Sequence, residues 1–193
     1  MCIRDSDEVY DRIVYDGPHV SFLGAGYDKV IMVQSFSKTF AMTGWRIGYL
    51  LSPDAQAMLQ LTKMQYYVTA CSNDAMQHAV LEALVNAPDY PEEMCSEFKD
   101  RRDLVCERLN AMPGVSCHVP TGAFYVFPKV DVPGMNSEEI SIALLEGGVL
   151  CSPGTAFGEL GESHLRFAYT ICREDIDKGM DRVETVLAEL RGD

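Results

Sequence analysis

The sequence predicts an α/β domain followed by a smaller α+β domain. Two observations support this prediction. In the first half of the 193-residue chain, short apolar runs alternate with segments whose apolar residues recur at helical spacing, which is typical of α/β folds. After a long charge-rich segment, the pattern changes to several short strand-like segments. We therefore expect a boundary near residue 89, with one domain over residues 7–88 and a second over residues 89–193.

The first domain is expected to hold two short strands and then two helices. Short apolar runs favour buried strands, whereas longer segments with apolar residues on one face favour helices. Ser52 is a candidate N-cap of the first helix, and Pro53 suits a first helical turn. The expected elements are strands at 30–34 and 46–51 and helices at 53–68 and 72–85.

The second domain is expected to begin with one long helix, which Pro113-Gly114 ends. Short strands and two further helices follow it. The expected elements are helices at 90–112, 136–146 and 173–190 and strands at 115–118, 123–127, 148–151 and 164–169.

The first six residues do not fit this pattern. They are polar at the place where a strand of a buried sheet is expected to run into Asp7. We interpret residues 1–6 as a head that is not native to the gene, and we leave them out of the predicted fold.

Charge and cysteine content exclude several classes of function. The net charge is −13, from 16 basic and 29 acidic residues, which argues against nucleic acid and anionic membranes as partners. No apolar stretch approaches the length of a membrane span, and no secretory signal opens the chain. The seven cysteines are odd in number and lack a Cys-x-x-Cys pair. They indicate reduced thiols in a cytoplasmic protein, with neither a disulfide framework nor a metal site.

One lysine stands between two of the expected strands. Lys38 lies in a serine-rich turn, where burial would disfavour the ammonium form and leave an amine that attacks aldehydes. Ser35, Ser37 and Arg46 offer the hydroxyls and the guanidinium fork that a phosphate ester needs. Taken alone, Lys38 also fits a solvated surface lysine on a loop.

Two short segments around Lys38 closely resemble the cofactor-lysine motif of class I (fold type I) pyridoxal-phosphate aminotransferases. They are Ser35-Phe36-Ser37-Lys38 and, after it, Gly44-Trp45-Arg46-Ile47-Gly48. The resemblance implies pyridoxal 5′-phosphate as cofactor and Lys38 as the internal aldimine lysine. It also implies that Ser35, Ser37 and Arg46 hold the cofactor phosphate. We expect Gly44 and Gly48 to allow a close approach of the backbone.

Three more of the proposed site residues come from two other parts of the chain. Asp7-Glu8-Val9-Tyr10 is similar to the family's Asp-x-x-Tyr. By that resemblance Asp7 would keep the pyridine nitrogen protonated and Tyr10 would bond the ring hydroxyl oxygen. Arg166, a charge inside a predicted strand, would bind the substrate α-carboxylate. Alone, Asp7 also fits a cap or turn residue, and Arg166 a structural ion pair.

Two turn-plus-aromatic segments match further family signatures in the second domain. They are residues 120–125, Pro-Thr-Gly-Ala-Phe-Tyr, and residues 153–158, Pro-Gly-Thr-Ala-Phe-Gly. The resemblance places both segments on the substrate side of the cleft. Residue by residue, each also fits a turn with a core aromatic.

The resemblance covers residues 7–190 but only the C-terminal half of a typical family member. It implies the end of a large cofactor-binding domain, a mixed sheet with flanking helices, and then a small α+β domain. We expect the upstream phosphate loop, the ring-stacking aromatic and an Asn-Pro-x-Gly segment to be missing. The 193-residue chain alone is therefore expected to be inactive and to aggregate through exposed strand edges.

The reaction that the resemblance implies is amino transfer between an α-amino acid and a 2-oxo acid, in a homodimer. A carbon–sulfur β-lyase on the same scaffold remains open, as does a non-catalytic cofactor-sensing domain. The sequence does not identify the amino acid donor. No arginine lies between Arg46 and Arg101, where some dicarboxylate-specific relatives bind a side-chain carboxylate, and this weakens a strict preference for aspartate.

Overall fold

The computed structural model describes residues 4–192. The chain divides into two compact units, the first ending at Cys95 and the second beginning at Ser96. The change from one unit to the other falls within a single long helix, α4 (Tyr90–Ala111). The domain boundary expected near residue 89 stays a prediction.

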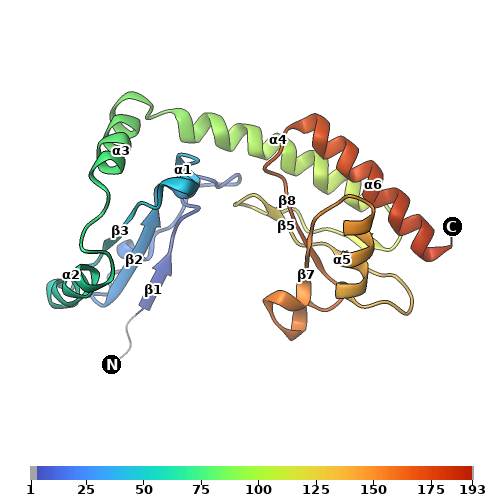
Figure 1. The fold of residues 1–193 in the computed structure, drawn as a ribbon, viewed down its shortest axis with the longest axis horizontal. Helices are drawn as coiled ribbons and strands as arrows, with labels where there is room; N and C mark the ends of the chain where they lie inside the picture. Colours follow the sequence, from blue (N-terminus) through green and yellow to red (C-terminus); the bar gives the residue numbers. More distant parts are fainter. Residues whose placement is uncertain (1–3, 193) are drawn as a thin grey trace. The chain divides into compact units, whose positions relative to one another are not determined.

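The first unit is built on a three-stranded mixed sheet in the order β1-β2-β3 (Figure 1). β1 (Arg4–Asp7) runs parallel to β2 (Val30–Ser35), and β3 (Gly48–Leu51) runs antiparallel to β2. Every second residue of β2 is buried, because alternate side chains of a strand point to opposite faces of the sheet.

β1 includes residues that the sequence analysis left out of the fold. Residues 4–6 pair with β2 in register, and Asp7 lies opposite Val33. A polar strand pairs in this way because the ladder uses main-chain groups. The proposed non-native origin of residues 1–6 stays a prediction, and residues 1–3 lie outside the described residues.

The helices of the first unit are α1 (Phe36–Thr39), α2 (Ala55–Thr69) and α3 (Asp74–Asn86), with short 3-10 turns at Phe22–Ala25 and Thr43–Trp45. The expected N-cap of the first long helix was wrong. Asp54 caps α2, because its carboxylate accepts from two successive N–H groups, those of Gln56 and Ala57. The Ser52 hydroxyl accepts from the N–H of Asp54 itself.

The second unit combines two small sheets with α5 (Ser137–Glu146), α6 (Arg173–Arg191) and the rest of α4 (Figure 1). One sheet pairs β4 (Val115–Ser116) with β6 (Lys129–Val130). The other has the order β5-β8-β7, from Tyr125–Val126, Leu165–Ala168 and Ser152–Pro153.

One expected strand of the second unit is displaced. The pattern predicted a strand at 148–151, but the pairing falls on Ser152–Pro153. Residues 148 and 149 cap the C-terminal end of α5 instead, because the amides of Gly148 and Val149 donate hydrogen bonds to carbonyls of its last turn. Gly148 has a φ of 84°, a conformation that glycine adopts without strain.

The core of the second unit lies between α5, α6 and the strands. Ile176, Met180, Val183 and Leu187 form one buried stripe along α6, which is the spacing of an amphipathic helix. Within residues 4–192, no helix is long and apolar enough to cross a membrane.

Candidate functional site

The serine turn, residues 35–37, connects β2 to the helix that carries Lys38. The Ser35 hydroxyl accepts from the Ser37 amide at 3.1 Å and donates to the Ser37 hydroxyl at 2.8 Å. It thereby caps α1, so Lys38 lies on a one-turn helix and is half-buried. The Thr43 hydroxyl donates to the Ser37 carbonyl at 3.0 Å, which fixes the far side of the turn.

Arg46 follows the serine turn in an unusual backbone conformation. Its φ is 53°, in the left-handed region that non-glycine residues seldom adopt. The side chain is exposed, and its Nη1 donates to the Thr43 carbonyl at 2.8 Å. Backbone strain at a polar residue is typical of functional positions.

The two glycines beside Arg46 differ in what they do. A Cβ on Gly48 would lie 2.5 Å from the Gln34 carbonyl oxygen, so only glycine allows β3 to lie this close to β2 at Ser35. The expected close approach is confirmed at Gly48. At Gly44 no heavy atom of the described residues lies within 4 Å of such a Cβ, and the expectation stays a prediction there.

A cavity of about 800 Å³ brings three of the predicted residues together. Ser35, Ser37 and Arg46 line it, and no acidic residue occurs among its described lining residues. The opposite wall is largely apolar and comes from α2. Hydroxyl and guanidinium donors beside an apolar wall match a phosphate ester on an aromatic ring, so these residues fit the expected cofactor.

Lys38, Asp7 and Tyr10 are not among the described residues that line this cavity. Lys38 follows Ser37 directly on α1. Asp7 is exposed at the end of β1, where its carboxylate accepts from the Val9 amide at 3.3 Å. Tyr10 is half-buried in the turn that follows β1.

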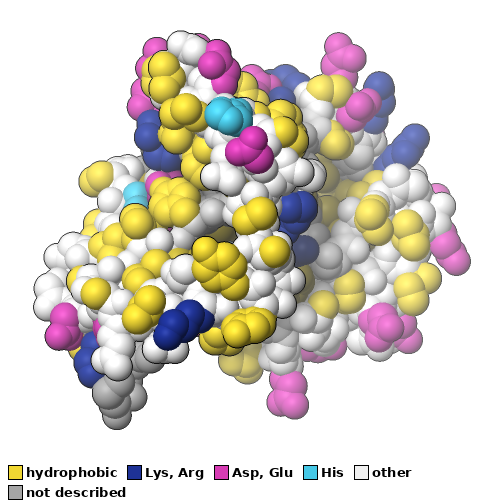
Figure 2. All heavy atoms as spheres, turned by 60° about the vertical axis from the view of Figure 1, so that its left-hand side comes forward, with side chains coloured by type: hydrophobic (Ala, Val, Ile, Leu, Met, Phe, Trp, Pro, Cys, Tyr) yellow, Lys and Arg dark blue, Asp and Glu magenta, His cyan; other side chains and the backbone are white. Residues whose placement is uncertain are grey.

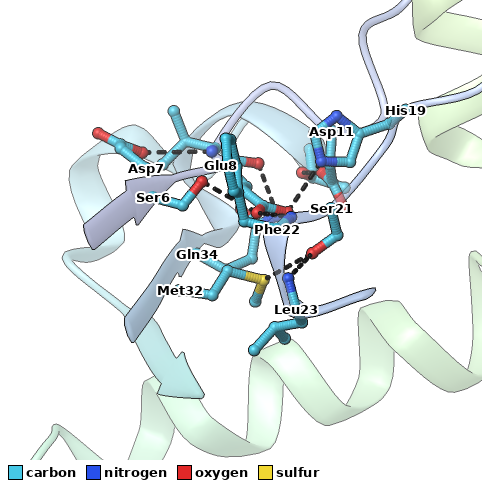
Figure 3. Close-up of polar contacts among 12 residues, drawn as sticks. Ser6, Asp7, Glu8, Asp11, His19, Ser21, Phe22, Leu23, Met32 and Gln34 are labelled. Atoms are coloured by element: carbon cyan, nitrogen blue, oxygen red, sulfur yellow. Dashed lines mark hydrogen bonds and ion pairs between the residues drawn. The ribbon is translucent and has the colours of Figure 1, made fainter. Parts of the chain in front are cut away.

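The most buried acid of this region is Glu8, which the sequence reasoning missed. Its side chain is buried at the end of β1, and its carboxylate accepts from the Ser6 hydroxyl, the Phe22 amide and His19 Nε2 (Figure 3). The distances are 3.0, 3.0 and 2.8 Å.

Burial by itself would raise the pKa of Glu8. The hydrogen bonds from His19, Ser21, Phe22 and Ser6 outweigh burial, and the pKa is lowered. The family motif leaves this position open, so no sequence signal marked it.

In the second unit, the Arg166 side chain contacts two aromatic rings. Its guanidinium carbon is 4.6 Å from the centre of the Tyr125 ring and 4.3 Å from that of Phe157. The two rings come from the segments 120–125 and 153–158, so the structure joins three motifs that the sequence only showed in order. Within residues 4–192, the Arg166 side chain contacts these two rings and forms no ion pair with an acidic side chain.

Comparison with known proteins gives one family. A family model described as aminotransferase class I and II matches residues 6–183. An aspartate aminotransferase of Pyrococcus horikoshii is 41% identical over 186 residues, which are 94% of this chain and 47% of that protein. Aromatic-amino-acid aminotransferase 2 of Thermococcus litoralis is 40% identical and is covered to 48%.

Solved structures agree with these relatives. An aromatic aminotransferase from Pyrococcus horikoshii OT3 has a TM-score of 0.89 and 39% identity, with 97% of this chain and 51% of that chain covered. An alanine aminotransferase from Pyrococcus furiosus has a TM-score of 0.87 and 35% identity, with 96% and 49% covered. The fold class expected from the sequence is confirmed, and the chain spans about half the length of the relatives it matches.

The fold, the family model and the relatives thus agree with the cavity, whose serine hydroxyls and arginine fit a phosphate ester. The cofactor that this family uses is pyridoxal 5′-phosphate. The chain belongs to the class I and II aminotransferases.

Proposed function

We propose that this chain forms part of an enzyme that transfers an amino group between an α-amino acid and a 2-oxo acid with pyridoxal 5′-phosphate. The observation that carries the proposal is the cavity in which Ser35, Ser37 and Arg46 meet directly beside Lys38. Aspartate and aromatic aminotransferases among the relatives support the reaction class. Their differing substrate names leave the amino acid donor open.

The serine turn and Arg46 would bind the phosphate end of the cofactor. Two hydroxyls donate single hydrogen bonds, and a guanidinium adds charge and a fork. Asp7 would hold a proton on the ring nitrogen, because a carboxylate favours a nearby positive charge. Tyr10 would donate to the ring hydroxyl oxygen.

Lys38 would hold the aldehyde end and then move a proton. When bound, pyridoxal phosphate accepts the electron pair left at the substrate Cα. The Lys38 amine would act as a general base that takes the proton from the substrate Cα and delivers it to C4′ of the cofactor. Its place on a capped helical turn limits the positions that the amine can reach.

Arg166 would bind the substrate α-carboxylate. The Tyr125 and Phe157 rings both contact its guanidinium. Contact with a ring uses none of the guanidinium's N–H donors, so they are offered to a carboxylate. Stacking of this kind also reduces the rotamer freedom lost when the carboxylate binds.

We further propose that the whole protein is a homodimer. The proposal rests on exposed apolar side chains of the first unit that do not line the cavity, which we call the apolar face. They are Tyr67 of α2 and Leu81, Leu84 and Val85 of α3, which are 50–92% exposed. Figure 2 shows hydrophobic side chains gathered on the side of the molecule that this view brings forward. Apolar patches of this kind mark interaction sites.

The test is a visible absorption spectrum with added pyridoxal phosphate, for the parent chain and for Lys38→Ala. It should be run on the 193-residue chain and on a longer product of its gene, if the gene encodes one. We expect a band that needs Lys38 and that bleaches when amino acids are added. Arg101→Ala, a change on α4 outside the cavity, is the control and should keep the band.

Each outcome decides between the readings. A keto-acid product that appears only with a 2-oxo acid acceptor supports amino transfer, whereas pyruvate and ammonia without an acceptor indicate a β-lyase. A Lys38-dependent band with no turnover of any amino acid indicates a cofactor-sensing domain. Absence of the band in every form of the protein contradicts the proposal.

A further inference from the structure

The side chain of Gln34 connects two segments that carry site residues. Gln34 is 5% exposed and is the second-last residue of β2. Its Nε2 donates to the carbonyl oxygen of Glu8 at 2.8 Å, and its Oε1 accepts from the Ser35 amide at 2.7 Å. A carboxamide can bridge a carbonyl and an N–H in this way because it offers a donor and an acceptor together.

The two partners of Gln34 adjoin two segments to which the proposed function assigns site residues. Glu8 follows Asp7 directly, and its amide makes the hydrogen bond to the Val33 carbonyl that extends the β1–β2 ladder, at 2.9 Å. On the other side, Ser35 begins the serine turn. Gln34 therefore ties the backbone beside Asp7 to the backbone that presents the two hydroxyls.

The Glu8 carboxylate holds the first of these partners in place. It accepts from Ser6 on β1 and from His19 and Phe22 in the following loop (Figure 3). The result is a continuous chain of hydrogen bonds from this loop through Glu8 and Gln34 to Ser35. All of its members belong to the first unit.

We propose that Gln34 is a positioning residue that sets the distance between the two ends of the cofactor site, Asp7 at one end and the serine turn at the other, with Glu8 as its anchor. The inference rests on the proposed function. Pyridoxal phosphate is a rigid ligand with a polar group at each end, so its affinity depends on both partners being placed correctly at once. A ligand that reaches only one end does not sense this distance.

The experiment uses that difference. Gln34→Met keeps the length of the side chain and removes both hydrogen bonds. Gln34→Asn keeps the amide but is too short to reach both partners, and it serves if the methionine variant does not fold. Gln77→Met is the matched control, because Gln77 makes one side-chain hydrogen bond, to the Ser72 carbonyl, and is exposed on α3.

Affinity is measured for pyridoxal phosphate, for pyridoxal and for inorganic phosphate. We expect either Gln34 variant to lose about tenfold more affinity for pyridoxal phosphate than for each single-ended probe. The reason is that the two hydrogen bonds of Gln34, one buried and one part-buried, no longer connect both segments. The Ser35 amide should exchange its hydrogen faster than in Gln77→Met, which needs no cofactor to observe.

Equal losses for all three ligands would overturn the inference, because a generally weakened fold affects each probe alike. Unchanged affinities, or a Ser35 amide as protected as in the control, would overturn it too. A parent protein that binds pyridoxal phosphate through Lys38 while these results fail leaves the proposed function standing. A parent protein without a Lys38-dependent band removes both.

Discussion

At the scale of single residues, the site combines groups that face a ligand with groups that hold them. Ser35, Ser37 and Arg46 line the cavity. Glu8 lies between Asp7 and Tyr10 in the sequence and is buried, and its carboxylate accepts hydrogen bonds from its surroundings. Such supporting residues determine how well the ligand-facing groups are placed.

Glu8→Gln tests this support through pH. Because hydrogen bonds lower the pKa of Glu8 in the folded state below its ordinary value of 4.5, ionised Glu8 stabilises the fold. That contribution is present above the unfolded-state pKa and is lost as pH falls through the folded-state pKa. We expect Glu8→Gln to lower the free energy of unfolding by about 1–3 kcal/mol at neutral pH.

The difference between parent and Glu8→Gln should shrink as the pH falls below about 4.5, measured by urea unfolding at a series of pH values. The titratable group that faces Glu8 is His19, and the other donors are hydroxyl and amide groups. Glu107→Gln, an exposed change on α4, is the control. A difference that stays constant down to acid pH would contradict the assignment.

At the scale of elements, N-cap side chains determine where several helices begin. Asp54 caps α2 and Asn73 caps α3. α5 begins with a capping box, in which the Asn136 side chain accepts from the amides of Glu138 and Glu139 and the Glu139 carboxylate accepts from the Asn136 amide. These bonds satisfy N–H groups that a helix cannot pair internally.

Asn136→Ala should destabilise the protein by about 1 kcal/mol, because two amides of the first turn lose their acceptor. Asn86→Ala is a suitable comparison, since Asn86 ends α3 and bonds the exposed Glu82 side chain, and its loss should cost less than about 0.5 kcal/mol. Thermal or urea unfolding measures both. Equal effects of the two variants would show that the capping box contributes little.

At the scale of the whole molecule, the chain combines a net charge of −13 with an exposed apolar face on α2 and α3. α2 has fifteen residues and none of them is buried. A helix this apolar and this exposed gains most of its stability by packing against another surface. The face is therefore prone to association.

Tyr67→Lys should reduce self-association of the chain, because it places a charge within this face. Tyr67 is 92% exposed, so the change should alter the free energy of unfolding by no more than about 0.5 kcal/mol. Leu160→Lys makes a similar change at a residue that is 98% exposed in the second unit. Sedimentation velocity over a range of concentrations compares them. If Leu160→Lys lowers the average mass as much as Tyr67→Lys does, the face has no special role.

The sequence by itself determined the family, the fold class and most elements of this protein. The spacing of Lys38 and Arg46, the apolar runs of the strands and the amphipathic stripe of α6 are local patterns, and local patterns reflect backbone periodicity and side-chain chemistry. The domain boundary and the roles of the site residues remain predictions.

Only the tertiary structure decided which side chains meet. Glu8 and His19 are eleven residues apart, Gln34 reaches back across 26 residues, and the two rings that contact Arg166 come from two distant segments. Such contacts depend on strand register and loop paths, which no local pattern encodes. The same reason explains why polar residues 4–6 joined the sheet and why Gly48, but not Gly44, lies against the backbone of β2.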